Sequence, residues 1–203
     1  MTSDIPDEES LDETPEEAEA YRRLLREQKL KKGLLIVNTG TGKGKTTAAF
    51  GLAMRARGRG MRVIMIQFIK RGTARFGEIR SARELGIEVR GMGDGWTWRS
   101  KDLDESAELA RAGWARAQGV IAGGEYDLVI LDEFTYPLHY GWLDTTEVLA
   151  WIAANKPPML HLAITGRYAP EALIEAADLV TEMRLIKHPF KEQGIRAQPG
   201  IEF

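Results

Sequence analysis

The segment Gly33–Thr47, GLLIVNTGTGKGKTT, limits the possible folds more than any other part of the chain. It begins with an apolar run, Leu34–Val37, which is typical of a strand buried on both faces, and such strands usually belong to parallel sheets. A glycine-rich turn follows, and Lys45, Thr46 and Thr47 then open a helix. A strand, a glycine turn and a helix in this order predict an α/β domain with a phosphate-binding loop after its first strand.

The glycine turn has the chemistry of an anion site. We expect Gly40, Gly42 and Gly44 to adopt positive φ angles and to bring successive backbone N–H groups to face one point. The dipole of the following helix favours negative charge there, Lys45 adds a positive charge for the outer phosphates, and Thr46 offers a hydroxyl to Mg²⁺. A turn that only joins a strand to a helix does not need Lys-Thr at its end, so we favour a phosphate loop.

Composition and charge exclude several classes of protein. The 203 residues contain no cysteine, which excludes disulfides, thiolate zinc sites and cysteine nucleophiles. No apolar run approaches the ~18 residues that cross a bilayer, and the N-terminus is acidic, so we expect a cytoplasmic protein with no membrane partner. Residues 1–19 carry nine acids and no base, so the formal net charge of −2 becomes +7 for the remainder. That charge suits a nucleoside triphosphate, and without a basic run interleaved with aromatics we expect no nucleic-acid partner.

The N-terminal region divides into two segments by composition. Residues 1–19 have too few apolar side chains to offset the entropy of ordering, and we expect them to be disordered. Residues 20–32 mix leucines with basic side chains, which fits either a short amphipathic helix or a solvated linker, and the residue types alone favour the linker. Residues 33–203 are expected to form one P-loop domain of RecA-like type, with a mostly parallel sheet and helices on both faces.

Chemically active residues follow two further apolar runs that are typical of strands. Asp132 and Glu133 come directly after residues 127–131, and acids at this point of a P-loop domain have the character of a Walker B element that holds Mg²⁺ directly or through water. Paired acids there can instead cap a helix. Arg167 follows the run at residues 159–164. Because parallel strands share one carboxyl edge, it can reach a phosphate there, or pair with an acid on the surface.

A glycine-rich loop at residues 91–99 carries two tryptophans, Trp96 and Trp98. Tryptophans on such a loop fit a surface for a flat apolar ligand or a partner chain, and they equally fit a loop pinned to the core. The three histidines are scattered along the chain, so we expect no histidine metal site.

These features predict a nucleotide-binding domain without fixing its reaction, because P-loops serve hydrolases, kinases, motors and transferases. One alternative is a P-loop ATPase or a kinase-type phosphotransferase, in which Glu133 would polarise water. Another is a nucleotide-binding module that regulates a partner through Trp96 and Trp98.

Six sequence blocks, in order, resemble the ATP:corrinoid adenosyltransferases of bacterial cobalamin biosynthesis and salvage. The resemblance runs from Gly33 to Phe203. It departs at Thr41, where the family usually has asparagine. The usual phosphate-loop pattern has a glycine at the position of Thr39, and the lack of that glycine is similar to the family. The blocks are TGTGKGKTTAAFG (39–51), VIMIQFIKRG (63–72), GWTW (95–98), VILDEFTY (129–136), ITGR (164–167) and the close KHPF…GIRAQPGIEF (187–203).

The resemblance implies a homodimer that transfers the 5′-deoxyadenosyl group of ATP to Co(I) of a reduced corrinoid, cobalamin or cobyrinic acid a,c-diamide, and releases tripolyphosphate. Lys45 and Glu133 would then be catalytic, with Mg²⁺ on Thr46 and on Glu133 or Asp132, to stabilise the leaving triphosphate. It also implies a lid at residues 20–32 in place of a linker, and a flavoprotein reductase as a candidate partner. Corrinoid-binding residues would be Trp96 and Trp98, and ATP-binding residues would be Thr39, Gly40, Thr41, Gly42, Lys43, Gly44, Lys45, Thr46, Thr47 and Arg167.

Overall fold

The computed structural model describes residues 14–27, 31–69, 77–92 and 103–202, and the chain divides into two units, Met1–Lys31 and Lys32–Phe203. The first unit carries helix α1 (Pro15–Glu27). This helix begins before residue 20, within the segment expected to be disordered, and it includes residues 20–27, where either a short helix or a linker was expected. Proline suits the first position of a helix, and Glu16 in the first turn complements the helix dipole, which explains the earlier start.

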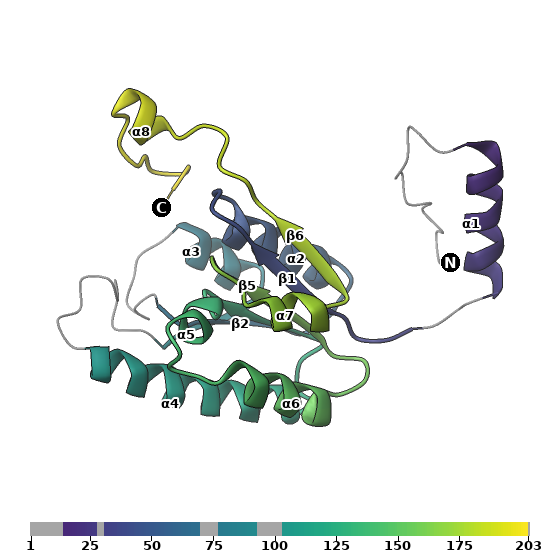
Figure 1. The fold of residues 1–203 in the computed structure, drawn as a ribbon, viewed down its shortest axis with the longest axis horizontal. Coiled ribbons are helices and arrows are strands. Elements are labelled where there is room, and N and C mark those ends of the chain that lie inside the picture. The colour runs from purple at the N-terminus through teal and green to yellow at the C-terminus, as the bar shows by residue number, and fades with distance from the viewer. Residues whose placement is uncertain (1–13, 28–30, 70–76, 93–102, 203) are drawn as a thin grey trace. The chain divides into compact units, whose positions relative to one another are not determined.

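The second unit is built on a sheet of six parallel strands. They are β1 (Leu35–Thr39), β2 (Val63–Gln67), β3 (Glu88–Gly91), β4 (Leu128–Asp132), β5 (His161–Thr165) and β6 (Leu179–Glu182). Their order across the sheet is β3-β2-β4-β5-β1-β6, and every neighbouring pair is parallel (Figure 1). All residues of β1, β2 and β4 are buried, as continuous apolar runs predict. The predicted α/β fold is confirmed.

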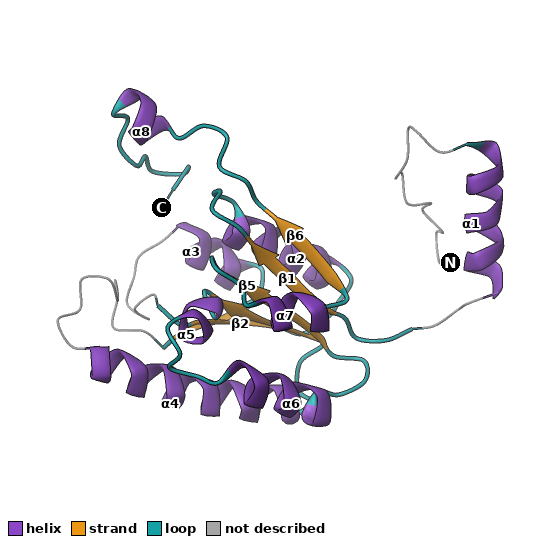
Figure 2. Cartoon of the chain, in the orientation of Figure 1, coloured by secondary structure: helices purple, strands orange, loops and turns teal. Residues whose placement is uncertain are grey.

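Helices cover both faces of this sheet (Figures 1 and 2). Helices α2 and α3 pack on one face through the core that contains Ala53 and Ala82, and α4 to α7 pack on the other through residues such as Trp114 and Leu173. Among the described residues, no helix has the length and apolar character needed to cross a membrane. The helices of this unit are α2 (Lys45–Gly58), α3 (Gly77–Glu84), α4 (Leu103–Ala122), α5 (Thr135–His139), α6 (Thr145–Asn155), α7 (Glu171–Ala176) and α8 (Pro189–Gln193).

Side-chain size sets how closely α2 approaches the sheet. Ala49, Ala53 and Ala56 are its buried residues, and they pack against one face of the strands. Because alanine adds little thickness, the helix lies close to the sheet.

The turn after β4 is anchored differently, by Phe134, which is fully buried with its ring centroid 4.7 Å from that of Phe68. Both contacts position residues at the carboxyl edge of the sheet, where the ligand of an open α/β sheet usually binds.

Two segments without a regular apolar pattern contain short helices. Pro137 lies within α5, at its third residue, where a backbone N–H has no partner in the helix, so proline costs no hydrogen bond. Helix α8 begins with Pro189, and the His188 side chain caps it by accepting the Phe190 N–H at 3.2 Å.

Candidate active site

The phosphate loop connects the carboxyl end of β1 to the amino end of α2. Gly40 and Gly44 have φ angles of 95° and 109°, in the left-handed region that favours glycine, as predicted. Gly44 is also the residue before α2, and no side chain caps this helix. Since the first N–H groups of a helix have no partner within it, the amino end of α2 offers donors to an anion.

Gly42 has a different role from the one expected. Its φ angle is not positive, and its N–H donates to the carbonyl oxygen of Met183 at 2.6 Å. A Cβ at Gly42 would lie 2.7 Å from that oxygen and 2.9 Å from the carbonyl oxygen of Arg184. The prediction that this amide faces the ligand is therefore wrong, because the backbone after β6 packs against the loop and binds the amide itself.

The Lys45 side chain reaches back from the start of α2 to the backbone of the phosphate loop. Its Nζ donates to the carbonyl oxygens of Gly40 at 2.8 Å and Gly42 at 2.5 Å. Burial lowers the pKa of Lys45 and the charge of Arg167 lowers it further, while the carboxylates of Glu133 and Asp132 oppose both effects. The ammonium is thus close to other charged groups of the site and is held by acceptors that a phosphate oxygen can replace.

Asp132, the last residue of β4, is the centre of a buried hydrogen-bond network and is 0% exposed. Its Oδ1 accepts from the hydroxyls of Thr46 at 2.8 Å and Thr165 at 2.7 Å, and its Oδ2 accepts from Nε2 of Gln67 at 3.0 Å. Because the Thr46 hydroxyl donates its hydrogen bond to Asp132, its oxygen lone pairs remain available to a cation. Hydroxyl and carboxylate oxygens are the ligands that Mg²⁺ prefers, so this donor set fits the ion.

Glu133 follows directly and lies in a different environment. Its φ angle is 62°, which is uncommon for a residue with a side chain, and its N–H donates to the Thr165 hydroxyl at 3.0 Å. Whereas Asp132 lies in the buried network, Glu133 lines a cavity. The acid pair therefore separates into one buried carboxylate and one that a ligand can reach.

A cavity of about 1080 Å³ lies over this edge of the sheet. Its volume is slightly above the ~300–1,000 Å³ usual for small-molecule sites. Residues 42–47 form its phosphate-loop side. The other lining residues are Phe50, Gly77, Glu78, Arg80, Ser81, Glu84, Glu133, Tyr136, Tyr140, Thr165, Gly166, Arg167, Tyr168, Gly200, Ile201 and Glu202.

Three tyrosines line one side of the cavity. The ring centroid of Tyr136 lies 6.2 Å from that of Tyr140 and 6.3 Å from that of Tyr168. Tyr140 and Tyr168 are half-exposed. Burial and the Glu133 carboxylate raise the pKa of Tyr136 to about 12, so its hydroxyl stays protonated at neutral pH. These rings offer flat apolar surface, and the Tyr136 hydroxyl can donate a hydrogen bond beside Glu133.

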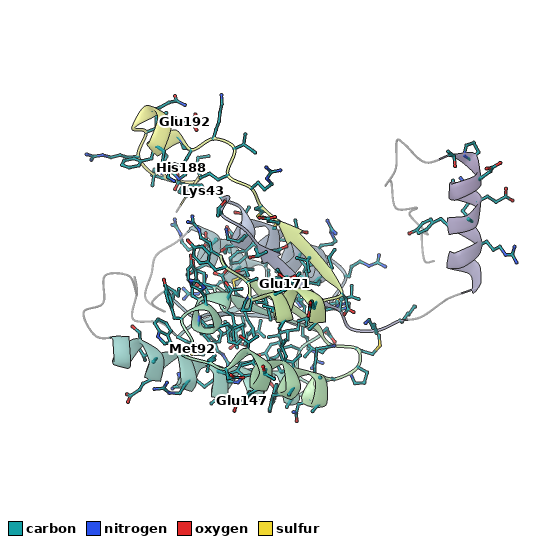
Figure 3. All side chains as sticks on the ribbon, in the orientation of Figure 1. Lys43, Met92, Glu147, Glu171, His188 and Glu192 are labelled. Carbon is teal, nitrogen blue, oxygen red and sulfur yellow. The ribbon has the colours of Figure 1, made fainter. Side chains whose placement is uncertain are left out.

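The C-terminal segment also reaches the phosphate loop. The Lys43 ammonium forms an ion pair with the Glu202 carboxylate at 2.5 Å. Figure 3 labels Lys43 of the loop and His188 of this segment. Gly200 and Ile201 line the cavity as well. No pattern in residues 187–203 predicts this contact, because it depends on where the chain turns after β6.

The structure brings many of the predicted site residues together. Residues 42–47, Glu133 and Arg167 line one cavity, and Asp132 contacts it through Thr46 and Thr165. Thr39, Gly40 and Thr41 do not line it. Trp96 and Trp98 lie outside the residues that the structure describes.

Several residues of this site have no binding or catalytic role among the predictions made from the sequence. Gln67 and Thr165 are the last residues of β2 and β5, and their position at strand ends is a signal that could have identified them. Tyr136 and Tyr140 lie three and seven residues after Glu133, in the segment that leaves the end of β4, which is a similar signal. Tyr168 has the weaker signal of following Arg167.

Comparison with known proteins identifies relatives over most of the chain. Residues 31–203 match the family model described as ATP:corrinoid adenosyltransferase BtuR/CobO/CobP. A corrinoid adenosyltransferase of Sinorhizobium sp. is 43% identical over 174 residues, which cover 85% of this chain and 81% of the relative. One from Pseudomonas aeruginosa is 41% identical over 206 residues, which cover 95% of this chain and 100% of the relative.

A solved structure with a similar fold is the flagellar accessory protein FlaH from Methanocaldococcus jannaschii. The TM-score is 0.53, and the match covers 75% of this chain and 72% of that chain. Because only 12% of residues are identical, the likeness concerns the P-loop fold alone.

Proposed function

This chain belongs to the ATP:corrinoid adenosyltransferase family, and from that membership we infer how it adenosylates a corrinoid. We propose that the phosphate loop binds ATP so that the triphosphate leaves as one piece while cobalt attacks C5′ of the ribose. The observation that carries this proposal is the convergence of Lys45, Thr46 and Glu133 on one cavity at the carboxyl edge of the sheet.

The bond changes explain which groups the protein must supply. The electron pair of Co(I) forms the cobalt–carbon bond, the C5′–O bond breaks, and its pair leaves on an oxygen of tripolyphosphate. Cobalt is the nucleophile, so no protein nucleophile is needed. The protein must instead stabilise the negative charge that grows on the leaving group, which is the role of Lys45 and the N–H groups at the start of α2.

Mg²⁺ bound with ATP would neutralise part of the triphosphate charge. We propose that Thr46 and Glu133 hold the ion, with Asp132 accepting a hydrogen bond from the Thr46 hydroxyl and orienting it. The complete burial of Asp132 and its three hydrogen bonds support this indirect role. Arg167, which also lines the cavity, would contact the nucleotide.

For the corrinoid, we propose that Trp96 and Trp98 displace the lower axial ligand, as the family implies. Replacing Trp98 by alanine should then prevent formation of four-coordinate cobalt when Co(II) corrinoid binds in the presence of MgATP. The measurement is the electronic or magnetic spectrum of the bound corrinoid, and an unchanged spectrum in the variant would remove this loop from the mechanism.

Residues 20–32 are proposed to act as a lid over the corrinoid. Removing Met1–Lys31, the whole N-terminal unit, should raise the KM for corrinoid, while the KM for ATP should change little. Removing residues 1–13 alone is the control and should leave both values unchanged. Equal KM values for corrinoid in the two truncated proteins would contradict the lid.

We further propose a homodimer in the cytoplasm, with a flavoprotein reductase supplying the electron. The mass of the protein in solution tests the first point.

The reaction itself is tested with ATP and chemically reduced cobalamin. The expected result is the spectrum of an alkyl-cobalt product together with an equal amount of tripolyphosphate. A P-loop ATPase or kinase would instead form ADP or inorganic phosphate without any corrinoid, and a binding module would show tight nucleotide binding and no product.

A further inference from the structure

We propose that Thr165 and Gln67 are positioning residues, which fix the carboxylate of Asp132 and thereby orient the Thr46 hydroxyl for Mg²⁺. The inference rests on the proposed function, because it assumes that MgATP binds at the phosphate loop. It assigns to two buried residues a role that acts through Asp132.

Thr165 connects both acids of the pair. It is the last residue of β5, is 0% exposed, and lies on the strand next to β4. Its hydroxyl donates to Oδ1 of Asp132 at 2.7 Å and accepts the N–H of Glu133 at 3.0 Å. One side chain therefore holds the carboxylate of the first acid and the backbone of the second.

Gln67 holds the same carboxylate from the other side. It is the last residue of β2, is 1% exposed, and lies in register with Asp132 across the β2–β4 pair. Its Nε2 donates to Oδ2 at 3.0 Å. Each oxygen of the carboxylate is thus bonded from a different neighbouring strand.

This arrangement restricts rotation of the carboxylate about its Cβ–Cγ bond. With Oδ1 fixed, the Thr46 hydroxyl has a defined acceptor for its hydrogen bond. The lone pairs of the Thr46 oxygen therefore point in one direction. Loss of the Thr165 hydroxyl would remove one of the two hydrogen bonds that Oδ1 accepts, leaving the one from Thr46, and would leave the Glu133 N–H without this acceptor. Partners that orient metal ligands are typically worth about 10–100-fold in metal affinity.

The test measures the dissociation constant of ATP in excess Mg²⁺ and in EDTA for the full chain. Thr165→Val, which keeps the shape but removes the hydroxyl, should weaken binding in Mg²⁺ by about 10-fold or more and leave binding in EDTA unchanged. Thr165→Ser, which keeps the hydroxyl, should resemble the wild type. Hydrogen exchange of the Glu133 amide, measured without metal or ATP, should be faster in Thr165→Val only.

Thr135→Val is the matched control. Thr135 is also 0% exposed at this edge, but its hydroxyl donates to the carbonyl oxygen of Arg167 at 2.6 Å. This variant should change binding in Mg²⁺ and in EDTA by the same factor. The inference is overturned if Thr165→Val behaves like this control or keeps the wild-type ratio of the two constants. A wild-type protein that fails to bind MgATP would instead contradict the proposed function, and with it the premise of this inference.

Discussion

Replacing Lys45 by alanine is expected to lower kcat for adenosylation by about 10²–10³-fold, as the loss of one group that stabilises developing charge usually does. The ammonium is the full positive charge that α2 carries at its amino end, within reach of the Gly40 and Gly42 carbonyls. As the C5′–O bond breaks, negative charge grows on the triphosphate, and this charge must be balanced inside a partly buried site. The measurement is the initial rate of alkyl-cobalt formation at saturating ATP and corrinoid.

Lys43→Ala is the matched control for this experiment, because it removes a lysine of the same loop. The Lys43 ammonium is half-exposed and pairs with Glu202, and exposed ion pairs contribute little energy. We expect a much smaller loss of kcat for Lys43→Ala than for Lys45→Ala. Similar rates in the two variants would contradict the assignment of leaving-group stabilisation to Lys45.

The second large effect is expected for Gly42→Ala. The added Cβ would meet the carbonyl oxygens of Met183 at 2.7 Å and Arg184 at 2.9 Å, and these are backbone atoms that cannot rotate away. The loop must therefore shift, and the hydrogen bond from Gly42 to Met183 weakens. We expect a loss of about 1–3 kcal/mol in the free energy of unfolding and weaker ATP binding by at least about 10-fold.

The control is Gly51→Ala, inside helix α2, which follows the loop. A Cβ at Gly51 meets no atom within 4 Å, and alanine in a helix is more stable than glycine by about 0.5–1 kcal/mol. Urea unfolding and ATP titration of both variants separate the two effects. A Gly42→Ala protein as stable as the wild type would show that the backbone after β6 does not restrain the loop.

Much of the fold could be predicted, because it depends on local patterns. The continuous apolar runs at β1, β2 and β4 indicate strands buried on both faces, and the glycine turn with Lys45 and Thr46 indicates a phosphate loop. The predicted acid pair occurs at the end of β4, and its placement follows from the shared direction of parallel strands.

The rest depends on contacts between distant parts of the chain. Gln67 contacts Asp132 across 65 residues of sequence because β2 and β4 pair in a particular register. Glycine at position 42 is required by the approach of Met183, not by a positive φ angle. The strand end marks Gln67 as a candidate, but no local pattern identifies Asp132 as its partner or Met183 as the neighbour of Gly42. The early start of α1 does have a local signal, in Pro15, that the acidic composition obscured.

The most direct test of the account is a crystal structure with MgATP bound. It should place the phosphorus atoms of ATP beside the backbone of residues 40–46, with the Lys45 Nζ moved from the Gly40 and Gly42 carbonyls to phosphate oxygens. Phosphates bound away from residues 40–46, with Lys45 still bonded to those carbonyls, would contradict it.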